Sequence, residues 1–579
     1  MSAGRLATGA PSAQPLRAMI KMSTPQDFSG RYTHSKYSPH LPVVLRDRTW
    51  PDRVIEKAPR WCSVDLRDGN QALIEPMTVE QKMELYKLLV KVGFKEIEVG
   101  YPAASQTDFD FVRRLIDEDL IPDDVTVQVL SQTREDLILR TFEALKGVKR
   151  AIVHIYNSTS TVQRNKVFKM DEAGIKAIAV NGAEIVKACA SAAPETDWRF
   201  QYSPESFTGT EIDYAVEVCN AVLDVWQPQV SKPVIINLPA TVEMTTPNVY
   251  ADQIEYFSRQ VKYREAILIS LHTHNDRGCA VAAAELAVQG GADRVEGTLL
   301  GNGERTGNMC IVTMGMNLYS RGVDPELDFS NIDEIIQVVK RVTNLPVHPR
   351  HPYAGELVFT AFSGSHQDAI KKSLAEQADD EPWDVAYLPI DPRDLGRSYQ
   401  EVIRINSQSG KGGIAYIVEQ YRGLQLPRWL QIDFSGVVQG FAEETESEVP
   451  SAEIWRLFEE HYLKRVKPFS LQEFSLSHKD GRDSLQAALD AGGEAISIQG
   501  QGNGVVESFV SALAAQVAVP LVLVDYSEHA VTHSATSDAA CYVQMNIEGE
   551  RYCGVGMSSD IVEATLRAIL CAVNIYLTR

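Results

Sequence analysis

The sequence predicts an α/β protein built around a (β/α)₈ barrel, followed by a helical linker subdomain and a C-terminal α+β domain. Three observations support this fold. From about residue 60, short β-branched runs alternate with helical stretches. Eight such runs fill roughly 260 residues, which is the strand number and the usual size of a (β/α)₈ barrel. After residue 325 the alternation stops, and segments of a different kind follow.

The eight runs are predicted to be parallel strands buried on both faces, because apolar strands separated by helices indicate βα units. They cover residues 61–69, 96–102, 126–132, 151–158, 199–206, 234–241, 267–276 and 294–301. Helix candidates between them include residues 78–92, 134–145, 171–190, 211–226, 247–260 and 278–290. A doubly wound sheet is the competing architecture, but its first strand usually leads into a glycine-rich phosphate loop. Here the first run ends in DLRDGN, which favours the barrel.

Four regions are expected along the chain. Residues 1–44 form an N-terminal arm, expected to be partly disordered; residues 45–325 form the barrel, and residues 326–429 form the linker subdomain. Residues 430–579 form the α+β domain, in which a weak internal repeat occurs. ISIQGQGNGVVESFVSAL (496–513) and YCGVGMSSDIVEATLRAI (552–569) both read as a strand, a Gly-x-Gly loop and a helix. The repeat predicts a small pseudo-symmetric domain.

The composition limits the partners of the chain. Its 579 residues include 56 Lys and Arg against 77 Asp and Glu, a formal charge of −21. Nucleic acids and anionic membranes attract basic surfaces, so neither is expected as a main partner. The 8 cysteines form no CxxC pair, which indicates free thiols in a reducing compartment. The cytoplasm is the expected location, with the mitochondrion as the alternative because the first 26 residues lack acids and mildly resemble a transit peptide.

Polar and ionisable side chains gather at the C-terminal ends of the predicted strands. These ends form the active-site face in (β/α)₈ barrels. The eighth strand leads into the glycine-rich motif GNGERTGN (301–308), whose place after that strand would suit a phosphate-bearing cosubstrate. The strand-end residues are Arg67 and Asp68 (first strand), His154 (fourth), Glu205 (fifth), Thr241 (sixth), and His272 and His274 (seventh).

His272 and His274 predict a divalent metal site. Residues i and i+2 of a strand point to the same side, so both imidazoles can face the barrel mouth. A lone H-x-H pattern more often marks a hydrogen-bonded pair, but Asp68 and Asn308 follow other strands of the same barrel and would complete a ligand set. Such mixed nitrogen and oxygen ligands suit Mg²⁺, Mn²⁺ or Zn²⁺, and the pattern does not choose among them. Arg67, next to Asp68, could stabilise an oxyanion that develops on a carbonyl oxygen.

These motifs resemble those of the α-isopropylmalate synthases of leucine biosynthesis, in their long form. The similar stretches are DLRDGNQAL, LHTHNDRGCAVAAAELAVQGGADRVEGTLLGNGERTGN, FSGSHQDAIKK and NSQSGKGG, and the resemblance runs from about Leu45 to the C-terminus. It implies an acyltransferase that condenses acetyl-CoA with 3-methyl-2-oxobutanoate and water to 2-isopropylmalate and CoA. Related barrels make homocitrate or citramalate, or cleave 3-hydroxy-3-methylglutaryl-CoA.

The resemblance also implies residue roles in the barrel. The divalent metal would be Mg²⁺, with Mn²⁺ or Zn²⁺ as alternatives, and a monovalent cation such as K⁺ could assist. Asp68, His272 and His274 match the metal ligands, with Asn308 completing or bordering the set. Arg67 matches the residue beside the keto oxygen. The positions around the keto acid are matched by His154, Glu205 and Thr241, and Glu304 lies in the loop that faces the thioester.

Beyond the barrel, the resemblance implies a homodimer that is inhibited by leucine. His366, in GSHQD, matches a histidine that the partner subunit supplies, and Tyr399, in GRSYQ, matches a tyrosine near it. His366 is the expected base that deprotonates acetyl-CoA, relayed through water with Glu205 or Tyr399. Residues 430–579 match the leucine-sensing domain. The expected leucine site comprises Gly504, Tyr526, Ala530 and Ser537.

Two other functions compete with this one. A metal-dependent hydrolase could use the same barrel, but many of those enzymes carry H-x-H on the first strand, whereas here it follows the seventh. A non-catalytic amino-acid-binding regulator could be built around the C-terminal domain. The polar residues at the strand ends argue against that second alternative.

Overall fold

The computed structural model of the chain describes residues 37, 40, 43–397, 411–445, 449–479, 481–531 and 538–579. It divides into two compact units, one that contains the barrel up to Met314 and one that contains Gly315–Arg579. Of the expected arm 1–44, only residues 37, 40, 43 and 44 belong to the described part. Tyr399, Ser537 and most of the NSQSGKGG motif lie outside it.

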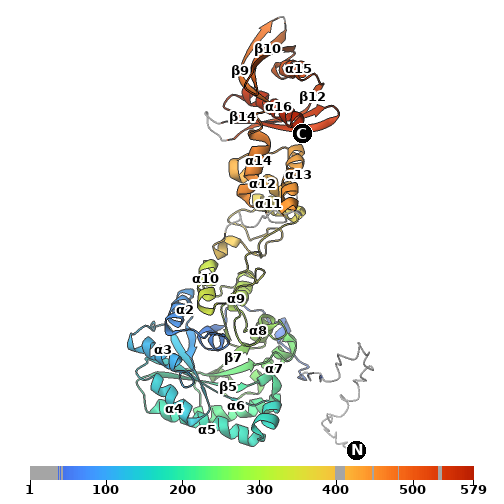
Figure 1. Cartoon of the computed structure of the whole chain (residues 1–579). Coiled ribbons are helices and arrows are strands. Elements are labelled where there is room, and N and C mark those ends of the chain that lie inside the picture. The colour runs from blue at the N-terminus through green and yellow to red at the C-terminus, as the bar shows by residue number, and fades with distance from the viewer. Residues whose placement is uncertain are drawn as a thin grey trace, which may run out of the picture. The chain divides into compact units, whose positions relative to one another are not determined.

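The predicted barrel is confirmed, with its eight strands in consecutive order and each parallel to its neighbours. Figure 1 shows these strands surrounded by helices. The strands are β1 (Arg60–Ser63), β2 (Glu96–Gly100), β3 (Thr126–Gln132), β4 (Arg150–Ser158), β5 (Asp197–Glu205), β6 (Val234–Ala240), β7 (Ile267–Thr273) and β8 (Arg294–Gly297). The helices between them are α2 (Val79–Val92), α3 (Gln106–Asp117), α4 (Glu135–Ala144), α5 (Glu172–Ser191), α6 (Ile212–Trp226), α7 (Pro247–Gln260) and α8 (Ala280–Gln289).

The first strand is shorter than the run 61–69 suggests. β1 ends at Ser63, and Asp65–Gly69 forms a single π-helical turn, η3. The turn is held by backbone bonds from the amides of Arg67 and Gly69 to the carbonyl of Val64. All five residues of η3 are buried, so the polar sequence DLRDG forms part of the barrel mouth rather than an exposed loop.

The interior of the barrel is polar, which is unusual for a layer that branched apolar residues commonly fill. Arg294 is fully buried and bonds to Glu96, Glu296, Ser270 and Gln128. The apolar core lies instead between the strands and the surrounding helices, where residues such as Leu89, Phe111 and Ile254 are fully buried. The interior charges are therefore paired inside a hydrophobic wall.

Helices follow the barrel in the second unit. They are α10 (Ile332–Thr343), α11 (Gly364–Glu376), α12 (Lys411–Arg422), α13 (Arg428–Thr445) and α14 (Ser451–Phe458). One apolar cluster joins α12, α13 and α14 to the C-terminal sheet, with Phe434, Phe458 and Tyr462 at its centre. The boundary expected at 429/430 stays a prediction, and it falls in the first turn of α13. Among the described residues, no helix combines the length and apolarity that a bilayer crossing would need.

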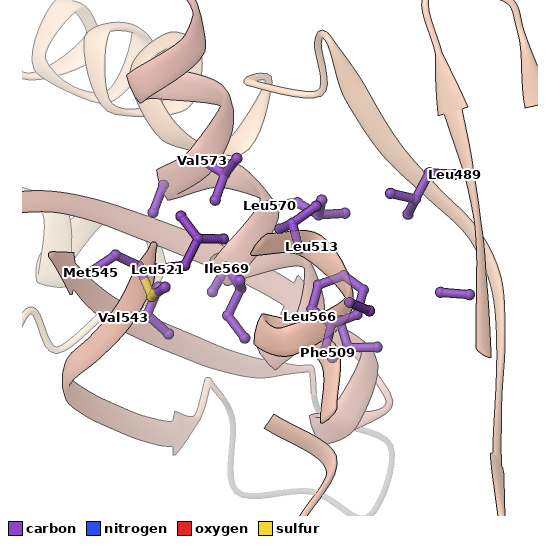
Figure 2. Close-up of a cluster of buried hydrophobic side chains, with 14 of the residues drawn as sticks. Leu489, Phe509, Leu513, Leu521, Val543, Met545, Leu566, Ile569, Leu570 and Val573 are labelled. Atoms are coloured by element: carbon purple, nitrogen blue, oxygen red, sulfur yellow. The ribbon is translucent and has the colours of Figure 1, made fainter. Parts of the chain in front are cut away.

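The C-terminal domain consists of two similar halves, as the internal repeat predicts. Each half has a three-stranded antiparallel sheet followed by a helix. The first half comprises β9 (Phe469–Lys479), β10 (Arg482–Ala491), β11 (Ala495–Gly502) and α15 (Val505–Val517). The second comprises β12 (Leu521–Ala530), β13 (Ala539–Ile547), β14 (Glu550–Ser558) and α16 (Ile561–Leu577). Side chains from both halves, including Leu489, Phe509, Leu566 and Ile569, form one apolar core (Figure 2).

The Gly-x-Gly pairs at 500–502 and 554–556 are not loops, so that part of the prediction was wrong, whereas Asn503 and Gly504 do form the bend before α15. Gly500 and Gly502 lie within β11, and Gly554 and Gly556 lie within β14. A Cβ atom on Gly554 would lie 2.0 Å from the carbonyl oxygen of Ala568 in α16. One on Gly500 would lie 2.2 Å from the carbonyl oxygen of Ser508 in α15. The glycines therefore allow each helix to pack closely against its sheet, and they offer no turn of exposed amides to a ligand.

Candidate active site and metal centre

A pocket of about 330 Å³ opens at the C-terminal ends of the barrel strands. The structure brings together eight of the barrel residues predicted to act there, and the ninth, Asn308, contacts Asp68. The pocket is lined by Arg67, Asp68, Gln71, Tyr101, Leu130, His154, Tyr156, Ser203, Glu205, Asn237, Pro239, Thr241, His272, His274, Glu304 and Arg305.

Asp68, His272 and His274 are buried and converge on one point. The Nε2 atoms of His272 and His274 lie 3.4 and 3.2 Å from the same carboxylate oxygen, Oδ2 of Asp68. One ligand atom from each residue lies within 4.8 Å of the other two. The rings meet edge to face, with centroids 5.0 Å apart, which follows from their i, i+2 spacing at the end of β7.

Asn308 completes this group because its loop returns to β7. His274 and Asn308 form an isolated antiparallel bridge, and the Asn308 amide donates to the carbonyl of Gly301. A Cβ on Gly307 would lie 1.9 Å from that carbonyl oxygen, so the tight loop requires glycine there. The Asn308 side chain donates from Nδ2 to Oδ2 of Asp68 at 2.7 Å. Its buried Oδ1 atom has no hydrogen-bond partner within the described part of the chain.

This donor set fits a divalent cation. His272 contacts Glu296 through Nδ1 at 2.9 Å, which leaves its Nε2 atom facing Asp68. A ring nitrogen this close to a carboxylate oxygen needs a proton or a cation between them, and a divalent ion would take the place of that proton. The unpaired Oδ1 of Asn308 supplies a further oxygen. Asp68, His272, His274 and Asn308 would hold the ion.

Arg67 stands beside these residues and is fixed on two sides. Its Nη1 group donates to Oδ1 of Asp68 at 2.7 Å, and its Nε group donates to Oε1 of Glu98. Neither bond uses the Nη2 group. Burial alone would raise the pKa of Asp68, but Arg67 and both histidines outweigh it, so that pKa lies well below its usual range. Asp68 is therefore ionised, as a carboxylate that binds a metal must be.

A second group, Glu98, His154 and Glu296, also has ligand atoms within 4.8 Å of one another. Its carboxylates are already bonded to nitrogen donors. Glu98 accepts from Arg67, Gln128 and His154, and Glu296 accepts from Arg294, Gln201 and His272. We interpret this group as a hydrogen-bonded layer beneath the metal ligands, since a cation there would face two guanidinium groups.

The keto-acid candidates come from adjacent strands: His154 lies in the middle of β4, Glu205 ends β5 and Thr241 directly follows β6. His154 bonds through Nε2 to the hydroxyl of Ser203 at 2.7 Å, and Glu205 accepts from the hydroxyl of Ser158. Thr241 accepts the amide of Ser206 at 2.9 Å. These bonds set the orientation of each side chain before any substrate binds.

Sequence reasoning missed several residues of this site. Glu98, Gln128, Gln201 and Glu296 lie in the middle of strands that read as apolar. One signal could have found them. A polar residue at the centre of a strand buried on both faces has no solvent to reach, so it must point into the barrel and find a partner there.

The predicted residues outside the barrel that the structure describes all belong to the second unit. His366 lies in the first turn of α11 and is half-buried, and its ring stacks on Tyr387 with centroids 4.0 Å apart. Tyr526 and Ala530 lie four residues apart on β12, the edge strand of its sheet. Gly504 precedes α15 in the other half of the C-terminal domain. The roles of these residues stay predictions.

Comparison with known proteins finds three family matches along the chain. Residues 58–339 match the HMGL-like family, and residues 356–419 match the alpha-isopropylmalate synthase post-catalytic domain-like family. Residues 448–577 match the LeuA allosteric (dimerisation) domain.

Similar full-length proteins carry the name 2-isopropylmalate synthase. That of Rhodospirillum rubrum is 56% identical over 546 residues, covering 93% of this chain and 98% of the relative. That of Parafrankia sp. is 56% identical over 564 residues, covering 96% and 99%. That of Paraburkholderia xenovorans is 53% identical over 543 residues, covering 93% and 94%.

Proposed function

Since this chain belongs to the 2-isopropylmalate synthases, we propose how the residues at its barrel mouth carry out the reaction. The enzyme acts in leucine biosynthesis and has an allosteric domain at residues 448–577. Its substrates are acetyl-CoA, 3-methyl-2-oxobutanoate and water, and its products are 2-isopropylmalate and CoA. The observation that carries the proposal is the convergence of Asp68, His272, His274 and Asn308 at the C-terminal end of the barrel.

The 2-oxo acid binds at the metal ligands. A divalent ion, with Mg²⁺ favoured over Mn²⁺ and Zn²⁺, supplies Lewis-acid polarisation of the keto carbonyl. Arg67 directs its Nη2 group to the keto oxygen, since its other nitrogens are held by Asp68 and Glu98. Thr241, His154 and Glu205 border the isopropyl and carboxylate groups. This arrangement prepares positive charge where the alkoxide will form.

Acetyl-CoA binds across the β8 loop, with Glu304 facing its thioester. His366 of the partner subunit removes a proton from the acetyl methyl group, relayed through water with Glu205 or Tyr399. The carbanion attacks the keto carbon, and the new carbon–carbon bond leaves an alkoxide held by Arg67. The alkoxide takes back the proton removed from the methyl group and becomes the hydroxyl, and water then hydrolyses the thioester, which releases CoA and leaves the second carboxylate of the product.

The allosteric domain gives the site its regulation. We propose that leucine binds near Tyr526 and Ala530 of β12, with Gly504 and Ser537 bordering it. The family match at residues 448–577 supports both dimer formation and effector binding. Because the glycine pairs lie within strands, the support comes from this match and from the edge position of β12, and not from glycine-rich turns.

One assay tests the proposal. CoA release should be measured with a panel of 2-oxo acids, with and without leucine, after the protein has been treated with a chelator and reloaded with each divalent ion. We expect release that requires both a divalent ion and a 2-oxo acid, is fastest with 3-methyl-2-oxobutanoate, and is reduced by leucine. CoA release that does not depend on any 2-oxo acid would instead indicate a thioester hydrolase.

A further inference from the structure

A buried lysine lies behind the proposed oxyanion residue and has no part in the chemistry described so far. Lys82, on α2, is fully buried, and its ammonium group donates to the backbone carbonyl of Leu66 at 2.6 Å and to that of Val99 at 3.4 Å. It pairs with Oδ1 of Asp108, on α3, at 2.7 Å. A buried ammonium is costly unless it is paired and fully hydrogen-bonded, and here all its bonds go to buried groups.

The two carbonyls that Lys82 holds adjoin the residues that fix each other at the mouth. The Leu66 carbonyl belongs to the peptide that leads into Arg67, and Val99 directly follows Glu98. Arg67 donates to Glu98 across this gap. Lys82 therefore holds the backbone on both sides of the bond that orients the guanidinium.

The sheet does not hold these segments together. The ladder between β1 and β2 consists of Cys62 with Glu96 and Ser63 with Ile97, and it stops before η3 begins. On the other side of β2, the register with β3 shifts between Glu98 and Gly100, so Val99 lies at an irregularity. Lys82 is thus a cross-link between η3 and the end of β2 beyond the last ladder pair.

Asp108 extends the same link to the pocket wall. Its Oδ2 atom accepts the backbone amide of Tyr101 at 2.7 Å, and Tyr101 lines the pocket. The close approach depends on Gly100, where a Cβ would lie 2.8 Å from the Asp108 carboxylate. The Asp108 side chain is 9% exposed, so water contributes little to this contact.

We infer that Lys82 and Asp108 form a positioning pair that sets Arg67 at the keto oxygen. The inference rests on the role proposed for Arg67. A pair that served stability alone could lie anywhere in the barrel wall, whereas this one bonds the peptides next to Arg67 and Glu98. Catalytic geometry must be held within about 0.5 Å, so releasing the two carbonyls should lower turnover even when the barrel stays folded.

The test is the double variant Lys82→Met/Asp108→Asn. It leaves no unpaired buried charge, and the Asn side chain can still accept from Tyr101, so the ammonium bonds to Leu66 and Val99 are what is removed. We expect kcat to fall roughly 10- to 100-fold, as for other supporting contacts of a site, with divalent-ion affinity measured by calorimetry within about twofold of wild type. Wild-type kcat in the folded variant would overturn the inference.

Two comparisons separate positioning from stability. Thr196→Val removes a buried side-chain bond to the carbonyl of Val148, at the opposite end of the barrel strands, and serves as the matched control. It should lower the melting temperature without lowering kcat. Lys82→Gln/Asp108→Asn also leaves no unpaired buried charge and keeps a side-chain donor near the two carbonyls, so it should lower kcat by a smaller factor and keeps the test available if the first double variant does not fold.

Arg67→Ala provides the last comparison. If the pair acts through Arg67, adding Lys82→Met/Asp108→Asn to Arg67→Ala should change 3-methyl-2-oxobutanoate affinity, measured by calorimetry, by no more than about twofold. If the loss of affinity in the combined variant equals the product of the losses in Arg67→Ala and in Lys82→Met/Asp108→Asn, the pair does not act through Arg67. A wild-type protein that releases no CoA would contradict the proposed function, while a working wild type with an equally active double variant contradicts only the positioning pair.

Discussion

At the residue scale, the site depends on side chains that share one carboxylate oxygen. Asp68→Ala or His272→Ala removes one member of the group Asp68, His272 and His274. We expect divalent-ion affinity and kcat to fall together by roughly 10- to 100-fold or more. Calorimetry on the metal-free protein gives the affinity, and CoA release gives kcat. Full metal content together with full turnover in either variant would show that the ion binds elsewhere.

Asp65 should make the stability of the barrel depend on pH. Burial raises its pKa to about 7, because bonds from Ser63 and from the amide of Leu299 offset the loss of water only in part. Between about pH 4 and pH 7 the folded protein keeps a proton that the unfolded chain releases. Unfolding free energy should therefore decrease as pH rises through this window, by about 1.4 kcal/mol per pH unit at most.

Asp65→Asn tests this linkage, since the amide keeps an acceptor for Leu299 and does not titrate. Urea unfolding at pH 5 and pH 7.5, followed by barrel fluorescence, should show a smaller decrease for the variant than for the wild type. The other titrating groups are common to both proteins, so the difference between them isolates Asp65. Equal decreases in the two proteins would mean that Asp65 is ionised throughout.

How far the sequence predicts individual residues depends on whether their partners are local. His272 and His274 could be found because two residues of one strand define the pattern, and Asp68 and Asn308 because they follow strands whose ends must meet. Glu98, Glu296 and Lys82 could not be found in this way. Their roles come from contacts between different strands and helices, and a single sequence does not specify which side chains meet inside a barrel.

At the element scale, the packing of each C-terminal helix depends on glycines in its sheet. Gly554→Ala would place a Cβ 2.0 Å from the carbonyl oxygen of Ala568, so α16 must move away from β14. We expect the domain to lose roughly 1–3 kcal/mol, as overpacked cores do. Differential scanning calorimetry should show a lower melting transition for the C-terminal domain and an unchanged one for the barrel.

Gly436→Ala, on α13, is the matched control. A Cβ there meets nothing within 4 Å, and alanine is the better helix former, so the variant should be slightly more stable than the wild type. A Gly554→Ala protein that melts like Gly436→Ala would show that α16 has room to shift.

Strands and helices were easier to predict than their ends. The eight barrel strands follow from apolar runs separated by helices, and the structure confirms all of them. The π-helical turn after β1 and the glycines within β11 and β14 were read wrongly as a continuing strand and as loops. In both places tertiary packing decided the local backbone conformation, and the secondary-structure propensities of the residues did not predict that conformation.

At the scale of the whole molecule, two copies of the chain should share each active site. His366→Ala and His274→Ala should each be inactive as homodimers. Mixed after dissociation, they should regain roughly a quarter of wild-type CoA release, because half of the dimers are hybrids and each hybrid has one intact site. Refolding each parent alone is the control. If the mixture remains as inactive as its parents, His366 does not act on the partner barrel.

Leucine should act on the barrel from the second unit. Ala530→Trp should fill the proposed pocket and remove leucine inhibition while kcat without leucine stays near wild type, since allosteric coupling energies are typically about 1–3 kcal/mol. Val522→Trp, on the same strand and exposed as Ala530 is, is the matched control and should keep its inhibition. An Ala530→Trp enzyme that is as sensitive as the wild type would place the leucine site elsewhere.

The polar interior of the barrel also governs how the chain can fold. Arg294, on the last strand, neutralises Glu96, on the second, and the two residues are 198 positions apart. At roughly 5 to 20 residues per second, a ribosome needs about 10 to 40 s to make the intervening chain. Until β8 arrives, Glu96 on β2 would be buried without Arg294, so closing part of the barrel gains little stability. Folding is therefore expected to wait for the last strand and to proceed as one late, cooperative step, during which the nascent chain depends on its own acidity or on chaperones to stay unaggregated.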